Sequence, residues 1–487
     1  MLTLADPKIL RRDAYVDGRW TLSGSGERFA VHNPATGETI AEVADLDAAD
    51  ARAAIEAADR ALPAWRGETA KERAVILRRW FELVMAAQDD LAQLMTAEQG
   101  KPLAETRGEV AYGASFIEWF AEEGRRAYGD VIPSHAAGKR ILVLKQPIGV
   151  VTAITPWNFP IAMITRKVAP ALAAGCTVVV KPPDETPLSA LALAELADRA
   201  GIPEGVLNVV TTTRAREVGL ELTQNPLVRK FSFTGSTEVG KLLMAQCATT
   251  VKKVSLELGG NAPFIVFDDA DLDQAVEGAL ASKYRNMGQT CVCANRFLVQ
   301  DKVHDAFEAR LAARVREMKV GNGADAGVTQ GPLITMDAVE KVERLLADAV
   351  AAGAKVEVGG HRHALGRTFF EPTVVTGVTP AMAISREEIF GPVATLTRFR
   401  DEAEAIRLAN DTDYGLAAYF YARDLARVFR VAEALEYGMV AVNDGILSTE
   451  VAPFGGVKQS GIGREGSKYG IEEYMELKYV LLGGLGA

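Results

Sequence analysis

The sequence predicts an α/β protein with parallel sheets, and three observations lead to this fold class. Short apolar strands alternate with helical segments after Arg140, a second series of the same kind follows Gly259 and Gly260, and amphipathic helices precede both series. Strands that alternate with helices imply right-handed crossovers and a parallel sheet buried on both faces. At about 150 residues per domain, the 487 residues predict roughly three domain-sized units rather than one compact core.

The helical part runs from about Asp47 to Glu123, where apolar residues recur every three or four positions. Three helices are expected there: ADARAAIEAADRALPAW, ERAVILRRWFELVMAAQDDLAQLMTAEQG, and a third segment that ends near Phe120. The strands expected next are ILVLKQP, GVVTAITP, TVVVKP, VLNVV, KFSFTG and VSLELGG, with helices from Ile161, over Ser189–Ala200, near Val218 and from Glu238. The second series has expected strands at PFIVF, RFLVQ, AKVEVG, TVVTG, ATLTRF, AAYFYA and MVAVN.

The composition is that of a soluble globular protein, with 48% hydrophobic and 24% charged residues. This balance excludes a disordered or a collagen-like chain. The longest mostly apolar run, Val168 to Val180, is interrupted by Pro170 and Gly175 and is shorter than the roughly twenty residues that a membrane span needs. We expect a helix, a turn and a buried strand there, and no membrane partner.

The charge balance argues against nucleic acid as a partner, because the formal net charge is −10 and no basic run exceeds two residues. The N-terminus shows neither a secretory signal nor a transit peptide. The four cysteines are too few for a disulfide framework in a chain of this size, and a reducing compartment suits them better. We therefore expect a cytoplasmic protein.

A glycine-containing turn, Gly235 to Leu242, follows an apolar strand and opens a helix, so its backbone N–H groups could meet a phosphate. It is one residue from a P-loop, which needs Ser or Thr where Leu242 stands. Asp268 in PFIVFDD resembles the acidic strand end of such a site. A nucleoside triphosphatase is therefore one alternative, and a plain strand-to-helix turn is another.

Two cysteines, Cys291 and Cys293, lie in GQTCVCANR just before an apolar strand. A thiolate there would be a nucleophile, although a free cysteine is more often a small buried hydrophobe. A metal site is disfavoured because no C-x-x-C or nearby His completes four ligands. A thiol hydrolase needs a His base, and the nearest is His304. Glu257 is the other candidate base, although a glutamate at a strand end is commonly just solvated.

Seven motifs, taken together and in this order, resemble the motif set of the NAD(P)-dependent aldehyde dehydrogenases. They are WNFP, VVVKP, GSTEVG, LELGG, GQTC, EEIFGPV and PFGGVKQSG. The resemblance runs from about Tyr15 to Tyr479, nearly the whole chain, and displaces the P-loop as the interpretation of Gly235 to Lys241. Within the family, SLELGGNAPFIVFDDADLD and RNMGQTCVCANR are most similar to succinate-semialdehyde dehydrogenases.

The fold that this resemblance implies has three parts. A Rossmann-like NAD(P)-binding domain would comprise residues 1–129 and 148–258, and an α/β catalytic domain residues 259–460. A small β bridging element would comprise residues 130–147 and 461–487. That element joins subunits in the family, so a homo-oligomer, a dimer or a tetramer, is expected.

The resemblance also implies a reaction. The Cys291 thiolate adds to the aldehyde carbonyl and gives a thiohemiacetal. The Asn158 amide and the Cys291 backbone N–H stabilise the oxyanion. Hydride passes to the nicotinamide and leaves a thioester, which a water activated by Glu257 hydrolyses to a carboxylic acid.

Cofactor contacts carry over from the family onto Trp157, Lys181, Gly235, Ser236, Gly240, Glu388 and Phe390. Lys181 would bind the adenosine ribose, Ser236 the pyrophosphate and Glu388 the nicotinamide ribose. Asp184, three residues after Lys181, would accept ribose hydroxyl hydrogen bonds and repel a 2′-phosphate. NAD is therefore favoured, while Arg214 leaves NADP possible.

Substrate contacts implied by the resemblance are Arg166, Arg285 and Ser448 around an aldehyde tail that ends in a carboxylate. Both arginines could instead be ordinary salt-bridge formers. The expected substrate is succinate semialdehyde, with glutarate semialdehyde as the alternative because one methylene separates the two. Cys293 is expected to form a reversible disulfide with Cys291, which requires a rearranged loop. No metal is expected.

Overall fold

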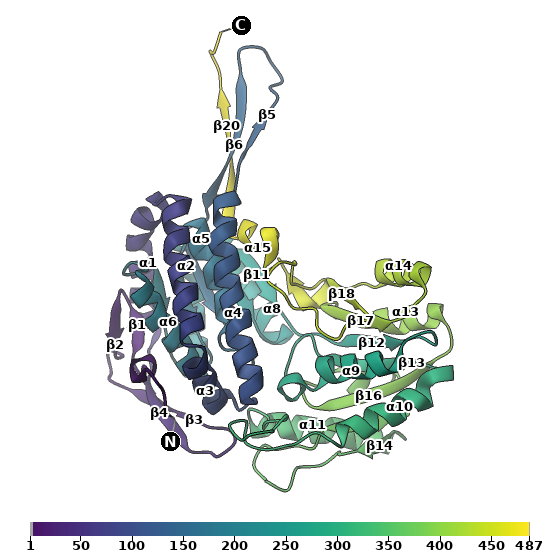
Figure 1. The fold of residues 1–487 in the computed structure, drawn as a ribbon. Helices are drawn as coiled ribbons and strands as arrows, with labels where there is room; N and C mark the ends of the chain where they lie inside the picture. Colours follow the sequence, from purple (N-terminus) through teal and green to yellow (C-terminus); the bar gives the residue numbers. More distant parts are fainter. Residues whose placement is uncertain (1–2, 487) are drawn as a thin grey trace.

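The computed structural model describes residues 3–486, which form two lobes and a narrow arm (Figure 1). An eight-stranded sheet in the order β19-β11-β10-β7-β8-β9-β1-β2 forms the centre of the first lobe. Its strands are β1 Ala14–Val16, β2 Arg19–Thr21, β7 Val150–Ile154, β8 Thr177–Lys181, β9 Leu207–Val209, β10 Val228–Thr234, β11 Lys253–Glu257 and β19 Gly461–Ile462. The strands from β7 to β11 pair in parallel, as predicted.

Helices cover both faces of this sheet. Val150 and Val179 point to the face that α1 and α7 cover, while Val151 and Val178 point to the face covered by α2 to α6. Side chains alternate along a strand, so burial on both faces favours apolar residues at most positions. The helices are α1 Ala48–Gly67, α2 Ala70–Ala86, α3 Gln88–Gln99, α4 Leu103–Glu123, α5 Ala162–Ala174, α6 Pro187–Ala200, α7 Ala215–Gln224 and α8 Thr237–Cys247.

One prediction about these helices is wrong. The stretch from Glu72 to Gly100, expected to be one helix, is divided between α2 and α3. The break lies at Ala87, whose φ of −95° and ψ of 13° leave the helical region. The periodicity hides the break because alanine favours a helix and the apolar spacing continues through it. The described residues therefore form four α-helices between Asp47 and Gly124 where three were expected.

A seven-stranded sheet forms the second lobe, in the order β14-β15-β16-β13-β12-β17-β18. Its strands are β12 Ala262–Val266, β13 Ala294–Gln300, β14 Lys355–Val358, β15 Thr373–Thr376, β16 Val393–Phe399, β17 Ala417–Tyr421 and β18 Met439–Val442. The helices of this part of the chain are α9 Leu272–Lys283, α10 Asp301–Val315, α11 Met336–Ala351, α12 Ala383–Arg386, α13 Glu402–Asn410 and α14 Leu425–Ala434, and α15 Ser467–Glu472 follows. All strands except β14 pair in parallel, as the second series predicted.

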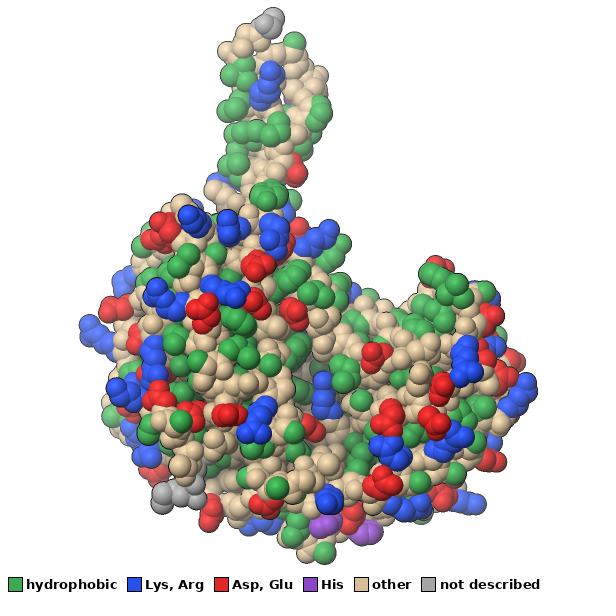
Figure 2. Space-filling model, in the orientation of Figure 1, with side chains coloured by type: hydrophobic (Ala, Val, Ile, Leu, Met, Phe, Trp, Pro, Cys, Tyr) green, Lys and Arg blue, Asp and Glu red, His purple; other side chains and the backbone are tan. Residues whose placement is uncertain are grey.

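The arm is an antiparallel sheet of β20 Met475–Leu482, β6 Arg140–Pro147 and β5 Asp130–Ile132. It projects from the first lobe (Figure 1) and carries exposed apolar side chains (Figure 2), among them Val131, Leu477 and Tyr479. A separate hairpin of β3 Arg28–His32 and β4 Thr39–Ala44 lies near the N-terminus. Within residues 3–486, no helix is both long enough and apolar enough to cross a bilayer.

The sheets show how the chain is distributed between the lobes. The second sheet begins at Ala262, and the chain returns to the first sheet at β19, where Ile462 pairs with Leu256 of β11. The segment after residue 460 therefore contributes both to the first lobe and to the arm. The domain bounds given above remain predictions.

Candidate active site

A cavity of about 290 Å³ opens where the two lobes meet. In the first sheet, β8 and β9 follow β7 on one side, while β10 and β11 lie on its other side. Strand order thus reverses between β7 and β10, and parallel sheets bind ligands beyond the carboxyl ends of strands at such a point. Asn158 after β7, Ser236 after β10 and Glu257 at the end of β11 line the cavity. Cys291, just before β13, lines it from the second lobe.

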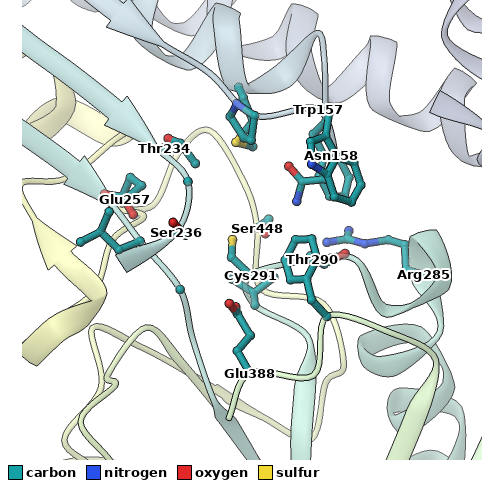
Figure 3. A pocket seen from close by; sticks show the side chains of 18 of the residues that line it. Trp157, Asn158, Thr234, Ser236, Glu257, Arg285, Thr290, Cys291, Glu388 and Ser448 are labelled. Carbon is teal, nitrogen blue, oxygen red and sulfur yellow. The ribbon is translucent and has the colours of Figure 1, made fainter. Parts of the chain in front are cut away.

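The thiol of Cys291 points into the cavity, between Asn158 and Ser236 (Figure 3). Burial raises the pKa of this thiol to about 12, although Arg166 and Arg285 act in the opposite direction. A thiol with this pKa is protonated at neutral pH, so it must lose its proton before it acts as a nucleophile. The residue predicted to be the nucleophile therefore lines the cavity, and burial favours its protonated form.

Asn158, the predicted oxyanion donor, is held through both its backbone and its side chain. Its Nδ2 donates a hydrogen bond of 3.0 Å to the carbonyl of Gln289, two residues before Cys291. Its own carbonyl accepts from Lys101 Nζ at 2.6 Å and from Asn286 Nδ2 at 3.0 Å. Since an amide nitrogen carries two hydrogens, one N–H of Asn158 is left for the cavity.

Glu257, the predicted base, is 2% exposed, and neither of its carboxyl oxygens has a hydrogen-bond partner among the described residues. Burial raises its pKa well above the ordinary value, and the nearby Glu465 adds to this shift. The pKa of Glu465 is lowered because Arg166 and Lys167 outweigh its burial. The pKa values of the two carboxyls are thus shifted in opposite directions, which favours the neutral form of Glu257 and the charged form of Glu465. Neither Glu465 nor Lys167 is among the site residues that the sequence predicts.

The two predicted substrate arginines differ in their partners. Arg166 is 1% exposed, and its Nε lies 2.5 Å from Glu465 Oε2. Arg166 thus forms a salt bridge and also lines the cavity, so its contact with the substrate remains a prediction. Arg285 is half-buried, lines the cavity and stacks over Phe159 with its Cζ 5.3 Å from the ring centre. No hydrogen bond or ion pair to Arg285 occurs among residues 3–486, so its guanidinium is free to bind a ligand. Ser448 lines the same cavity (Figure 3).

Five of the predicted cofactor residues line the cavity: Trp157, Gly235, Ser236, Glu388 and Phe390. The rings of Trp157 and Phe390 meet edge to face with centres 5.6 Å apart. Glu388 Oε1 accepts a hydrogen bond of 2.9 Å from the Gly260 N–H, and burial raises the pKa of Glu388 to about 7. Lys341 of α11, which sequence reasoning missed, lines the cavity too and opposes that rise.

The residues that line the cavity near the N-terminus of α8 fit a dinucleotide. Ser236 caps the N-terminus of α8, and its Oγ accepts from the Val239 N–H at 3.3 Å, so the positive end of the helix faces this region. Thr234 Oγ1 is buried and lacks a hydrogen-bond partner within the described chain. A Cβ on Gly259 would lie 2.9 Å from Glu388 Oε2, so the glycine leaves the space beside the Glu388 carboxyl unobstructed.

Comparison with known proteins decides the family. Residues 20–480 match the model of the aldehyde dehydrogenase family. The chain belongs to the aldehyde dehydrogenase family. Its relatives include a glutarate-semialdehyde dehydrogenase of Pseudomonas aeruginosa, 66% identical over 99% of this chain and 100% of the relative. The succinate-semialdehyde dehydrogenase (NADP(+)) GabD of Escherichia coli is 64% identical over 99% and 100%. A 3-sulfolactaldehyde dehydrogenase of Pseudomonas putida is 62% identical over the full length of both chains.

Solved structures agree with this membership. The crystal structure of succinate-semialdehyde dehydrogenase from Burkholderia pseudomallei is 63% identical and has a TM-score of 0.98, over 99% of this chain and 100% of that one. The betaine aldehyde dehydrogenase of Staphylococcus aureus in complex with NAD⁺ is 40% identical with a TM-score of 0.95, over 98% and 96%. The predicted family, fold class and NAD(P)-dependent oxidation of an aldehyde are confirmed.

Three predicted cofactor residues of this aldehyde dehydrogenase do not line the cavity. Lys181 ends β8, and its Nζ donates to the Pro182 carbonyl at 3.1 Å. Asp184 is exposed in the loop beyond. Gly240 lies inside α8, where a Cβ would approach Leu258 Cδ2 to 2.4 Å. Gly240 thus allows α8 to pack closely, and the roles of all three toward the cofactor remain predictions.

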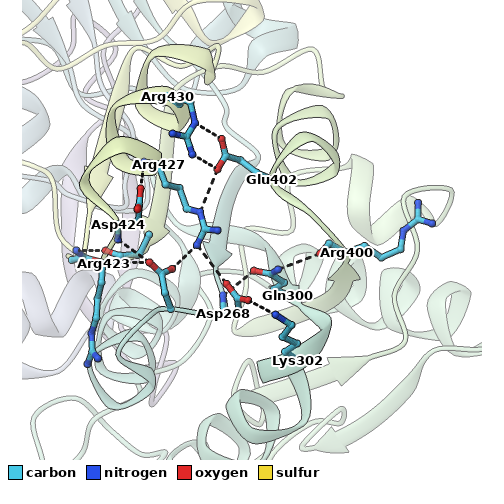
Figure 4. A network of polar contacts seen from close by, with 12 residues as sticks. Asp268, Gln300, Lys302, Arg400, Glu402, Arg423, Asp424, Arg427 and Arg430 are labelled. Carbon is cyan, nitrogen blue, oxygen red and sulfur yellow. Dashed lines mark hydrogen bonds and ion pairs between the residues drawn. The ribbon is translucent and has the colours of Figure 1, made fainter.

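The triphosphatase alternative does not fit the aldehyde dehydrogenase structure. Asp268 follows β12 in the second sheet, whereas the turn from Gly235 follows β10 in the first. Asp268 pairs with Lys302 at 2.9 Å and with Arg427 at 3.5 Å (Figure 4). It therefore belongs to a network that joins α14 to the loop after β12.

The thiol-hydrolase alternative lacks its base. His304 lies on α10, with Nδ1 3.3 Å from Asp305 Oδ1, and no histidine is among the described residues that line the cavity. Cys293 is buried, and its Sγ donates to the Lys283 carbonyl at 3.2 Å, so it does not share the cavity with Cys291. Both thiols are free, and the disulfide switch remains a prediction.

Proposed function

We propose that this enzyme oxidises succinate semialdehyde to succinate, with glutarate semialdehyde as the near alternative. The free guanidinium of Arg285 in the cavity wall carries this proposal. Arginine binds a carboxylate through paired hydrogen bonds, and a half-buried site strengthens them. The names of the relatives in Pseudomonas aeruginosa and Escherichia coli support the same substrate class.

In the proposed mechanism, Cys291 adds to the aldehyde carbonyl, and its proton leaves toward the carboxylate form of Glu257 or toward water. The free N–H of Asn158 and the backbone N–H of Cys291 donate to the oxygen that becomes negative. Losing one such donor raises the barrier by about 3 kcal/mol. NAD(P), when bound, supplies the hydride acceptor that turns the thiohemiacetal into a thioester. Trp157, Ser236 and Glu388 would hold it, as their position in the cavity suggests.

Glu257 then acts as the base that activates the water for hydrolysis of the thioester. Its unpaired oxygens and its burial suit this role, because no neighbouring donor competes with the water. The ion pair of Arg166 and Glu465 lies near it, and the Glu465 charge contributes to the raised pKa of Glu257. Ser448, which lines the cavity, would orient the substrate tail.

We also propose NAD as the preferred oxidant, since a carboxylate at Asp184 disfavours a 2′-phosphate. Arg214, which could favour NADP, is already paired with Glu27. The arm is proposed to join subunits into a homo-oligomer, because its exposed apolar side chains include Val131 and Leu477. The free cysteines among the described residues suit a reducing compartment such as the cytoplasm.

A substrate panel tests the proposal. Rates of the purified enzyme are measured with succinate semialdehyde, glutarate semialdehyde and butanal, each with NAD and with NADP. The value of kcat/KM for the two semialdehydes should exceed that for butanal by about tenfold or more, since hydrogen bonds to a charged group contribute about 1.5–3 kcal/mol. Equal values for all three aldehydes would contradict a carboxylate-binding site.

A further inference from the structure

A buried ammonium lies directly behind the cavity wall. Lys101 follows Gly100, which ends α3 with a φ of 94°, and precedes Pro102, the N-cap of α4. Its Nζ lies 2.6 Å from Glu109 Oε2, and both side chains are 1% exposed. A buried ion pair is a poor source of stability because both charges lose their water. The geometry around this pair points to a different role.

The ion pair holds one short segment at both ends. Lys101 Nζ donates to the carbonyl of Asn158 at 2.6 Å and lies 4.0 Å from the centre of the Phe159 ring. Glu109 Oε1 accepts from the backbone N–H groups of Ile161 and Ala162 at 3.0 and 3.3 Å. These N–H groups open α5, which has no side-chain cap of its own at Ile161. The segment from Asn158 to Ala162 is therefore fixed from one side by two charges.

The carbonyl of Asn158 also accepts a hydrogen bond from Asn286, in the segment that precedes Cys291. Asn286 Nδ2 donates to Asn158 O at 3.0 Å, and Asn286 Oδ1 accepts from Gln99 Nε2 at 2.9 Å. Asn286 has a φ of 52°, in the left-handed region that asparagine tolerates better than most residues. With its carbonyl held in this way, the side-chain amide of Asn158 can reach Gln289 O at 3.0 Å and present its second hydrogen to the cavity.

We propose that Lys101 is a positioning residue that, with Glu109, fixes Asn158 so that its side-chain amide meets the oxygen of the thiohemiacetal. Lys101 itself does not line the cavity, so it would act through Asn158. The inference rests on the proposed mechanism, in which Asn158 is the oxyanion donor. Without the ammonium, the Asn158 carbonyl would lose one of its two donors, and the amide would spend less time in the reactive orientation.

The double variant Lys101→Met/Glu109→Gln tests this role. Glutamine keeps the acceptor for the N–H groups of Ile161 and Ala162, and no unpaired charge stays buried. We expect kcat for succinate semialdehyde to fall about tenfold or more, while its KM and the affinity for NAD, followed by fluorescence, change less than twofold. Lys252→Met is the matched control, because Lys252 Nζ also donates to two buried carbonyls, of Asn225 and Val228, away from the cavity. It should leave kcat unchanged.

A second variant covers the case in which the first does not fold. Glu109→Asp retains both charges and draws the ammonium away from Asn158, so kcat should again fall with KM unchanged. In an Asn158→Ala background, neither change should lower kcat further, since the positioned group is gone. An unchanged kcat in a folded variant, a rise in KM alone, or additive losses in the Asn158→Ala background would overturn the proposal. Failure of the wild-type enzyme to oxidise any aldehyde would instead refute the proposed function.

Discussion

Arg166 is bound to Glu465, with 2.5 Å between Nε and Oε2, whereas Arg285, which lines the same cavity, forms no ion pair or hydrogen bond with an acidic residue among the described residues and interacts with Glu105 only at longer range. The charge of Arg166 is already neutralised, so Arg285 has the stronger attraction for a substrate carboxylate. The two arginines that the family resemblance places together are thus expected to contribute differently.

For Arg285→Ala, we expect KM for succinate semialdehyde to rise about tenfold to a hundredfold, because hydrogen bonds to charged groups contribute about 1.5–3 kcal/mol. Activity on butanal should persist, since that substrate has no carboxylate. Steady-state kinetics with both substrates checks this. Arg285→Lys is the control and should recover part of the loss, because lysine keeps the charge without the paired geometry. Equal losses on both substrates would assign Arg285 to the fold instead.

Cys291→Ala should abolish aldehyde oxidation, because no other thiol lines the cavity in the described part of the chain. Glu257→Gln should mainly slow hydrolysis of the thioester, since glutamine cannot accept the proton of the attacking water. Mass spectrometry of the glutamine variant after mixing with substrate and NAD should find an acyl adduct on Cys291. A fully active alanine variant would refute the assignment of the nucleophile.

The pH dependence of thioester hydrolysis should report Glu257. Its pKa is raised well above the ordinary value of 4.5 by burial and by Glu465, and it acts as a base only when ionised. The hydrolysis rate should therefore rise as the pH increases through this raised pKa, and the rise should be absent in Glu257→Gln. Glu388, with its pKa raised to about 7, is the control. If Glu388→Gln removed the rise instead, the titrating group would be Glu388.

Replacing Asp184 by Ser should increase the use of NADP relative to NAD. Electrostatic repulsion between a carboxylate and a phosphate about 4 Å apart costs about 1 kcal/mol of binding free energy in water and more near a protein surface. We therefore expect the ratio of kcat/KM with NADP to kcat/KM with NAD to increase about fivefold or more. Asp184→Glu should keep the preference for NAD, since it keeps the charge. A wild-type enzyme that favours NADP would contradict this assignment.

Oxidation by peroxide tests the proposed link between Cys291 and Cys293. The Cys293 thiol is directed to the Lys283 carbonyl, so a disulfide requires the loop to rearrange. If the disulfide forms, reductant should restore the activity of the wild-type enzyme, while Cys293→Ala should lose activity irreversibly through further oxidation of Cys291. Identical loss and recovery in the two proteins would place the switch elsewhere.

Local patterns predicted the strands of the two α/β series but not the four short strands before Asp47, and they predicted the site only in part. The run TVVVK has three successive valines, which is the pattern of a strand buried on both faces, and β8 covers these residues. The break at Ala87 escaped notice because a helix can end without a Gly or Pro when tertiary packing favours a turn. Residues that act through long-range contacts were missed for a different reason.

Glu465 and Lys101 are residues that the sequence could not single out, because their partners lie far along the chain. Each is an ordinary charged residue in the sequence, and its significance depends on partners far along the chain, Lys167 for Glu465 and Asn158 for Lys101. No spacing rule connects such positions, because the fold alone brings them together. Cys291 and Glu257 could be singled out because short motifs with glycine surround them.

The position of the last strand has a practical consequence for handling the protein. β20 pairs with β6 along the arm, with Met475 opposite Pro147 and Leu482 opposite Arg140, and the described part of the chain then ends near the tip of the arm (Figure 1). An affinity tag fused after residue 487 would therefore stand on the surface proposed for subunit contact, and removal of residues 475–487 would leave an edge of β6 open to pair with another chain. The described part of the chain begins on the body of the first lobe, away from the arm (Figure 1), so a tag placed before it leaves that surface free.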